Sequence, residues 1–167
     1  MRWLWIDRII DHEPNVRLVA IKNVSLAEEH LYDCTVDSQV IMPASLLIEG
    51  MAQSAGILVG ATSRFKEKVI LAKITKASFE RDVTAGDTVR YDATIDRIDE
   101  AGASTSGTID RRAAGGEAWQ RIGRIELIFS HIDNNLAGTE FPKHNFVFSD
   151  NFRMLLESSG LAGLMQE

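Results

Sequence analysis

The most distinctive pattern in the chain is a continuous apolar segment that begins just after Pro43. From Ser45 onward its sequence is S-L-L-I-E-G-M-A-Q-S-A-G-I-L-V-G-A-T, with apolar side chains on nearly every side of a helical wheel. A helix without a polar face has to be enclosed by the rest of the fold. Gly56 and Gly60 would let neighbouring segments approach closely, at a helix-propensity cost of about 1 kcal/mol each. The pattern predicts a buried central helix at about residues 45–63.

The segments around this helix have the alternation that is typical of strands. Bulky and β-branched residues at 3–10 predict a first strand, a turn follows at 11–15, and the imperfect alternation at 16–25 predicts its partner. Four further runs are separated by glycine-containing turns, at residues 69–79, 87–98, 103–110 and 118–132. One long helix followed by an antiparallel meander predicts an α+β domain over residues 1–132, in which the sheet wraps around the helix.

The last part of the chain, residues 133–167, has a different pattern and is interpreted as a C-terminal extension. Its start is irregular, and residues 146–148 then suggest a short strand. A helix follows, capped by Ser149 or Asp150 and ending near Gly160. Phe152, Leu155 and Leu156 give this helix an apolar stripe. We expect the stripe to pack on the domain or on a partner subunit.

Charge and composition narrow the classes of partner. Lys and Arg number 18 against 24 Asp and Glu, a net charge of −6, which argues against nucleic acid as a partner. The apolar segment contains a carboxylate, Glu49, so it is not expected to span a membrane. The single cysteine, Cys34, cannot form an intramolecular disulfide, which favours a reducing compartment. We therefore expect a cytoplasmic protein.

Glu49 is the strongest candidate for chemistry. Its sequence neighbours are apolar, and a carboxylate in such surroundings has to be hydrogen-bonded, shifted in pKa or placed at a cleft, where it often acts as a general acid or base. Gln53 lies four residues further on, on the same helical face, and can orient the carboxylate. The alternative, that Glu49 only bonds a nearby backbone group or arginine, stays open.

The helix start is a second candidate feature. At Met42, Pro43 and Ala44 it would present free backbone N–H groups to a thioester carbonyl oxygen or another anion.

These residues resemble a known family. The segment I-M-P-A-S-L-L-I-E-G-M-A-Q-S-A-G-I-L, at residues 41–58, is similar to the central helix of the hot-dog (3R)-hydroxyacyl-acyl-carrier-protein dehydratases of the FabZ/FabA type. The segments W-I-D-R-I-I-D and V-A-I-K-N-V-S look like the first two strands of these enzymes. The segment A-S-F-E-R-D-V-T-A-G-D-T-V looks like their turn motif, with its key positions at Phe79, Val83, Gly86 and Asp87. The similarity covers about residues 3–132.

The resemblance implies a hot-dog fold, a homodimer or higher homo-oligomer, and an active site at the subunit interface. In that family a histidine from one chain and the helix glutamate from the other remove water from a β-hydroxyacyl thioester, while backbone amides at the helix start hold the thioester oxygen. The resemblance places the glutamate at Glu49, its companion at Gln53 and the amide-donating position at Ala44, beside Met42. It implies an acyl-ACP or acyl-CoA thioester as the substrate of the cytoplasmic protein.

The family histidine has no counterpart in this sequence. Its position, counted back from the glutamate, is occupied by Thr35, and counted forward from the second strand it is occupied by Cys34. Threonine is no base near neutral pH, and cysteine becomes one only where its thiolate is stabilised. The nearest imidazole, on His30, could replace the missing base. His30, Cys34 and the aspartates near them lack the ligand spacing of a metal site, so we predict no metal and no cofactor.

Three functions are compatible with these residues. The first is a dehydratase of fatty-acid or polyketide-type metabolism, atypical or slow because of the replaced histidine. The second is a hot-dog acyl thioesterase, in which Glu49 acts as base or nucleophile beside Thr35, Gln39 and Gln53. The third is a non-catalytic subunit that binds acyl chains or an active partner.

Overall fold

The computed structural model describes residues 3–31, 35–36, 39–132, 142, 145 and 147–165. Its main feature is a six-stranded antiparallel sheet with the strand order β1-β2-β6-β7-β8-β5. The strands are β1 (Arg8–Glu13), β2 (Arg17–Asn23), β5 (Val69–Phe79), β6 (Thr88–Asp99), β7 (Gly102–Arg112) and β8 (Gln120–His131). A short hairpin of β3 (Thr35–Val36) and β4 (Gln39–Val40) precedes the long helix.

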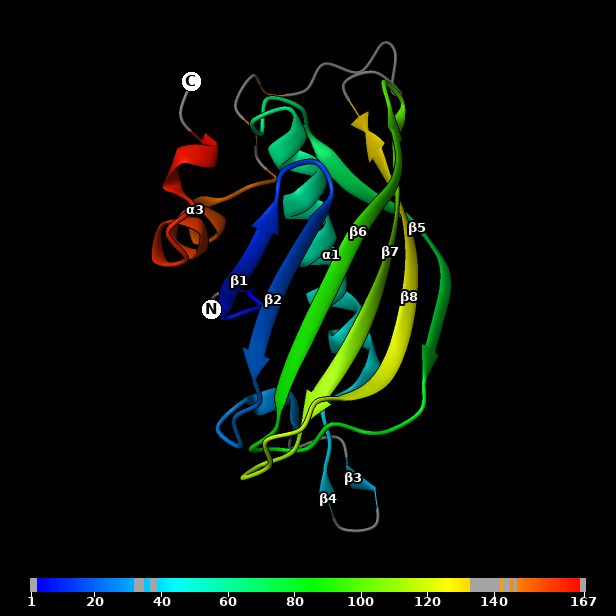
Figure 1. Cartoon of the computed structure of the whole chain (residues 1–167), viewed down its shortest axis with the longest axis vertical. Coiled ribbons are helices and arrows are strands. Elements are labelled where there is room, and N and C mark those ends of the chain that lie inside the picture. The colour runs from blue at the N-terminus through cyan, green and yellow to red at the C-terminus, as the bar shows by residue number, and fades with distance from the viewer. Residues whose placement is uncertain are drawn as a thin grey trace.

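The long helix α1 (Ala44–Thr62) lies along one face of the curved sheet and runs almost its whole length (Figure 1). It packs against β2, β5, β6, β7 and β8. Between Gly50 and Gly60 every residue of α1 is buried. A Cβ atom at Gly50 would overlap the ring of Tyr91 on β6, so the glycine lets helix and sheet approach closely. The predicted α+β class, with a sheet around one long helix, is confirmed.

The first strand lies later in the chain than predicted. β1 begins at Arg8, and Asp11 and Glu13 belong to it rather than to a turn. The turn is tight and includes Asn15 with φ of 63°, a conformation that asparagine tolerates. Strand β1 is an edge strand with a bulge between Ile9 and Asp11, so polar residues fit on its solvent side. Residues 3–7, here called the N-terminal segment, precede β1 and lie beside α1.

The helix α1 is long and apolar enough to cross a membrane by length and composition alone. In this fold, however, 72% of its apolar window is buried inside the protein. Burial by the surrounding sheet accounts for its composition, as in the core helix of a globular domain.

The C-terminal helix α3 (Asp150–Ser158) docks on the edge of the sheet beside β1 (Figure 1). Leu155 and Leu156 are buried, and the Ile9 amide donates a hydrogen bond to Ser159 Oγ at 3.0 Å. Val147 and Phe148 lie in a bend rather than in the expected strand, and Phe146 is outside the described residues. The apolar stripe of α3 thus packs on the domain of its own chain.

Candidate active site

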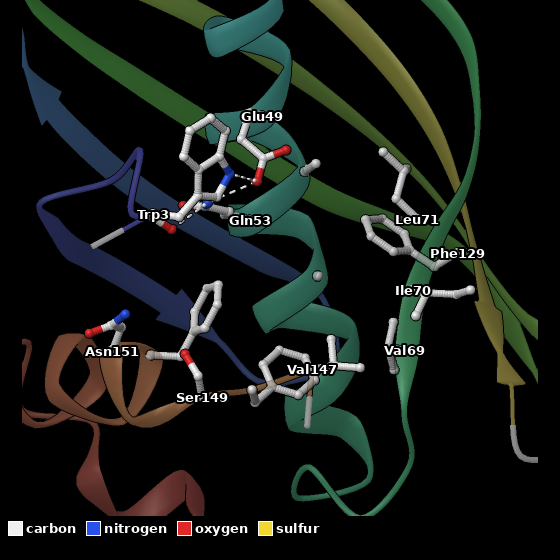
Figure 2. A pocket seen from close by; sticks show the side chains of 14 residues that line it. Trp3, Glu49, Gln53, Val69, Ile70, Leu71, Phe129, Val147, Ser149 and Asn151 are labelled. Carbon is white, nitrogen blue, oxygen red and sulfur yellow. Dashed lines mark hydrogen bonds between the residues drawn. The ribbon is translucent and has the colours of Figure 1, made fainter. Parts of the chain in front are cut away.

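A cavity of about 350 Å³ lies beside α1 and is bounded by segments far apart in the sequence (Figure 2). Helix α1 forms one side, and the first residues of β5 with Phe129 of β8 form another. The chain around the start of α3 forms a third side. The described lining residues are Trp3, Glu49, Ala52, Gln53, Gly56, Val69, Ile70, Leu71, Phe129, Val147, Phe148, Ser149, Asn151 and Phe152. Glu49 is the one ionisable side chain among these residues.

The carboxylate of Glu49 lies at one end of this cavity. Its Oε1 atom accepts hydrogen bonds from Trp3 Nε1 at 3.2 Å and from Gln53 Nε2 at 2.9 Å. The other carboxylate oxygen points away from Trp3 (Figure 2). Glu49 is half-buried rather than fully enclosed. One oxygen is therefore fixed in place, and the second can meet a ligand in the cavity.

Gln53 links this carboxylate to the N-terminal segment. Its side chain is only 6% exposed, and its Oε1 accepts a hydrogen bond from the Trp5 amide at 2.8 Å. Its Nε2 donates to the Trp3 carbonyl at 3.2 Å as well as to Glu49. Because Oε1 is occupied by a backbone donor, the amide nitrogen has to face the carboxylate. Gln53 therefore orients Glu49, as its spacing predicted it could.

The N-terminal segment contributes Trp3, which the sequence pattern did not single out. The Trp3 ring meets the Trp5 ring edge-on at 5.5 Å, and Trp5 meets His30 at 4.6 Å. His30 thus belongs to an aromatic cluster beside the site and is not among the described lining residues. The signal available in the sequence was the pair of tryptophans at 3 and 5, ahead of the first strand.

The residues around the helix start do not line the described cavity. Met42 is buried, and its amide donates to Val83 O at 2.8 Å, whereas Ala44 and Gln39 are exposed. The backbone of Thr35 pairs with Val40 in the β3–β4 hairpin. Cys34 lies outside the described residues. The roles predicted for these residues stay predictions.

The turn between β5 and β6 contacts the chain just before α1, because Val83 O accepts the hydrogen bond from the Met42 amide. The contacts within this turn give a physical reason for the family motif at Val83, Gly86 and Asp87. Gly86 has φ of 93°, in the left-handed region, and its amide donates to Val24 O. Asp87 is 2% exposed and accepts hydrogen bonds from the Thr84 amide at 2.8 Å and from Arg111 Nε at 2.6 Å. Burial alone would raise the pKa of Asp87, but the bonds from Arg111 and Thr84 outweigh it and hold the pKa below its usual value.

Metal chemistry has no visible support in the described part of the chain. Within residues 3–31, 35–36, 39–132 and the C-terminal stretches, no group of three or more His, Cys, Asp or Glu side chains could hold a metal ion. The expectation of no metal and no cofactor stays a prediction.

Comparisons with known proteins show the family to which the chain belongs. The family model described as the FabA-like domain matches residues 1–118. The 3-hydroxyacyl-acyl-carrier-protein dehydratase FabZ of Clostridium kluyveri is 33% identical over 125 residues, which cover 72% of this chain and 86% of that protein. The FabZ dehydratase of Caldanaerobacter subterraneus subsp. tengcongensis is 38% identical over 97 residues, or 58% of this chain and 68% of that one.

Solved structures with the same fold include an acyl-CoA hydrolase. An acyl-CoA hydrolase from Staphylococcus aureus, solved with butyryl coenzyme A, aligns with a TM-score of 0.55 at 16% identity, over 77% of this chain and 70% of that chain. The PaaI protein from the phenylacetic acid degradation operon of E. coli aligns with a TM-score of 0.56 at 12% identity, over 74% of this chain and 78% of that chain. These alignments confirm the predicted hot-dog fold.

Proposed function

This chain belongs to the FabA-like domain family, and from that membership and the geometry of its cavity we propose that it removes water from 3-hydroxyacyl thioesters. The carrier of the acyl group would be an acyl-carrier protein or coenzyme A, and the reaction would take place in the cytoplasm. The observation that carries the proposal is the Glu49 carboxylate, which has one oxygen held by Trp3 and Gln53 and stands at one end of a mostly apolar cavity.

The reaction requires two proton movements, and one positioned carboxylate can serve both. Ionised Glu49 takes the proton from C2 of the substrate, and the electron pair of that C–H bond forms the C2–C3 double bond. The C3–O bond breaks, and the departing hydroxide takes the proton from the Glu49 carboxyl group and leaves as water. A second general acid or base would contribute about 10²- to 10⁴-fold, so we expect slow turnover without the family histidine.

The start of α1 can stabilise the thioester oxygen. Pro43 supplies no side-chain cap, and Ala44 and Ser45 are exposed in the first turn. The first amides of a helix lack intrahelical acceptors and lie at the positive end of its dipole. In the proposed complex these amides donate hydrogen bonds to the thioester oxygen and stabilise the negative charge that develops on it when C2 loses its proton.

We propose that a second copy of the chain binds at the outer edge of β5, where no other strand pairs within the described residues. This strand pairs with β8 on one side, and its residues from Leu71 to Ser78 are all exposed. Leu71 and Ile74 are apolar and lie on this edge strand. Unpaired edges favour pairing with another chain. Because residues 69–71 also line the cavity, such a partner would stand next to the site.

Thioester hydrolysis is the second candidate, favoured by one observation. Glu49 is the one ionisable group among the described cavity-lining residues, and hydrolysis needs only one carboxylate, as base or nucleophile. The two reactions have different products. Hydrolysis releases a free thiol, whereas dehydration conserves the thioester and forms an enoyl group.

The decisive experiment compares the wild type with Glu49→Gln on 3-hydroxybutyryl and 3-hydroxyhexanoyl coenzyme A. Enoyl formation and free thiol are both measured, and Glu157→Gln on the exposed face of α3 is the matched control. We expect enoyl formation that falls at least about 10²-fold in Glu49→Gln and is unchanged in the control. Thiol release that depends on Glu49 would favour the hydrolase, and the absence of both products would favour a non-catalytic acyl-binding subunit.

A further inference from the structure

The C-terminal segment supplies one wall of the cavity, although it lies outside the matched part of the family model. Residues 147–152, here called the end wall, contribute five of the lining side chains, among them Phe148 and Phe152. The match to the family model covers residues 1–118. Figure 2 shows the end wall at the opposite end of the cavity from Glu49.

The end wall is held in place by specific packing. Phe148 rests on Gly60 of α1, where an added Cβ atom would come within 2.6 Å of its ring. Phe65 meets Phe148 edge-on at 4.7 Å, and Phe152 meets it at 5.8 Å. Asn145 fixes the preceding chain, because its Nδ2 donates to the carbonyls of Phe65 and Glu67, both at 2.9 Å.

The cavity has its one described ionisable group at one end and is mostly apolar beyond it. Glu49 and Gln53 lie at that end, while Phe129, Phe148 and Phe152 line the part farther from them, where Ser149 and Asn151 are the polar side chains. Along α1, the lining extends from Glu49 to Gly56, seven residues or roughly 10 Å of helix rise. The cavity volume of about 350 Å³ lies near the lower limit of about 300 Å³ for ligand sites.

We propose that the end wall closes the acyl site and restricts the protein to short acyl chains, with Phe148 and Phe152 as the specificity-determining residues. This inference rests on the proposed function, because it takes the thioester to lie at Glu49 and the acyl chain to follow α1 towards Gly56. A longer chain would have to displace Phe148 from its seat on Gly60.

The first test removes the wall side chains. Wild type, Phe148→Ala and Phe152→Ala are compared in their binding of butyryl, hexanoyl and dodecanoyl coenzyme A by titration calorimetry, and in their turnover of the matching 3-hydroxyacyl thioesters. Met154→Ala is the control, since Met154 lies on α3, is 42% exposed and is absent from the lining. We expect the alanine variants to raise both the binding constant and the turnover for the dodecanoyl substrate, relative to those for the hexanoyl substrate, at least about tenfold. The control should show no change in these ratios.

The second test makes the site smaller without removing any packing. A Cβ atom at Gly56 would lie 3.5 Å from the Phe129 ring, an ordinary contact, and Gly56 faces the cavity. Gly56→Ala is therefore expected to fold normally. It should lower the binding constant and the turnover for the hexanoyl substrate, relative to those for the butyryl substrate, by about tenfold. This variant keeps the proposal testable if Phe148→Ala does not fold.

The outcomes separate this inference from the proposed function. If binding depends on acyl-chain length and the variants change this dependence, but no substrate is turned over, the proposed role of the end wall is supported and the dehydratase activity is refuted. If the wild type and all variants turn over substrates with equal selectivity, the role of the end wall is refuted and the dehydratase activity stands. Tight binding of dodecanoyl coenzyme A by the wild type would also refute the role of the end wall.

Discussion

The indole Nε1 of Trp3 donates a hydrogen bond to Oε1 of Glu49 across 46 positions of sequence. The donor comes from the chain ahead of β1, and the acceptor comes from the buried helix. Gln53 binds both partners, through the Trp3 carbonyl and the Glu49 carboxylate. The N-terminal segment is thus part of the site, because its hydrogen bonds orient the Glu49 carboxylate.

Replacing Trp3 by phenylalanine tests this contact, since it removes the indole N–H and keeps an aromatic ring. A hydrogen bond to a charged group contributes about 1.5 kcal/mol or more, so we expect kcat/KM to fall about tenfold. Trp3 is 54% exposed, so the free energy of unfolding should change by less than about 0.5 kcal/mol. Trp119→Phe is the kinetic control, because the Trp119 ring stacks with Arg90 and does not line the cavity. Equal kinetics for Trp3→Phe and wild type would show that the contact does not position Glu49.

Gln53→Leu should destabilise the fold as well as the site. The substitution keeps the volume but leaves the buried Trp5 amide without its acceptor, which costs about 1–3 kcal/mol. Chemical denaturation measures this loss, and Gln120→Leu on the exposed side of β8 is the matched control. Unchanged stability of Gln53→Leu would mean that another group accepts the Trp5 hydrogen bond.

The strands and the central helix could be predicted from sequence because their patterns coincide with burial. Residues 69–79 were predicted and observed as β5, and α1 begins one residue before its predicted start. The first strand was predicted too early. The bulky residues at 3–6 resemble a strand, but their partners are α1 side chains rather than another strand.

The candidate site was predictable only where its residues share one element. Glu49 and Gln53 lie one turn apart on α1, so their hydrogen bond follows from helical spacing. Trp3 and Phe148 approach α1 from opposite ends of the chain, and no local pattern encodes such contacts. The same reason hid the end wall, whose position depends on Phe148 meeting Gly60.

Acid should destabilise the protein partly through Asp87. Burial raises the pKa of Asp87, but the bonds from Arg111 and Thr84 outweigh it, so the folded-state pKa is lower than the unfolded value of about 3.9. Asp87 therefore stabilises the fold above about pH 4, and this contribution is lost as the pH falls through the folded-state pKa. In Asp87→Asn the free energy of unfolding should be lower near neutral pH and should depend less on pH in the acid range. Asp82→Asn, at an exposed position, should follow the wild-type curve.

Tyr91→Phe should leave the fold as stable or make it more stable. Among the described residues no hydrogen-bond partner reaches the buried Tyr91 hydroxyl, and burial raises the pKa of this group above its usual value. Phenylalanine keeps the ring against Gly50 and removes the unsatisfied hydroxyl, a gain of up to about 2 kcal/mol. Urea denaturation measures the difference. Tyr91→Leu, which loses part of the ring volume, should instead be destabilised by about 1 kcal/mol or more.

Ile74→Lys tests the proposed assembly through β5. Ile74 is 44% exposed on the edge strand, and a lysine there would bring like charges together in an antiparallel pair of two copies. We expect sedimentation velocity to show a dimer for the wild type and a monomer for Ile74→Lys. Ile98→Lys is the matched control, because Ile98 is 40% exposed on β6, which lies inside the sheet order. Since residues 69–71 line the cavity, the monomeric variant should also lose turnover even though Glu49 keeps its hydrogen bonds. A wild type that sediments as a monomer and still turns over substrate would place the complete site within one chain.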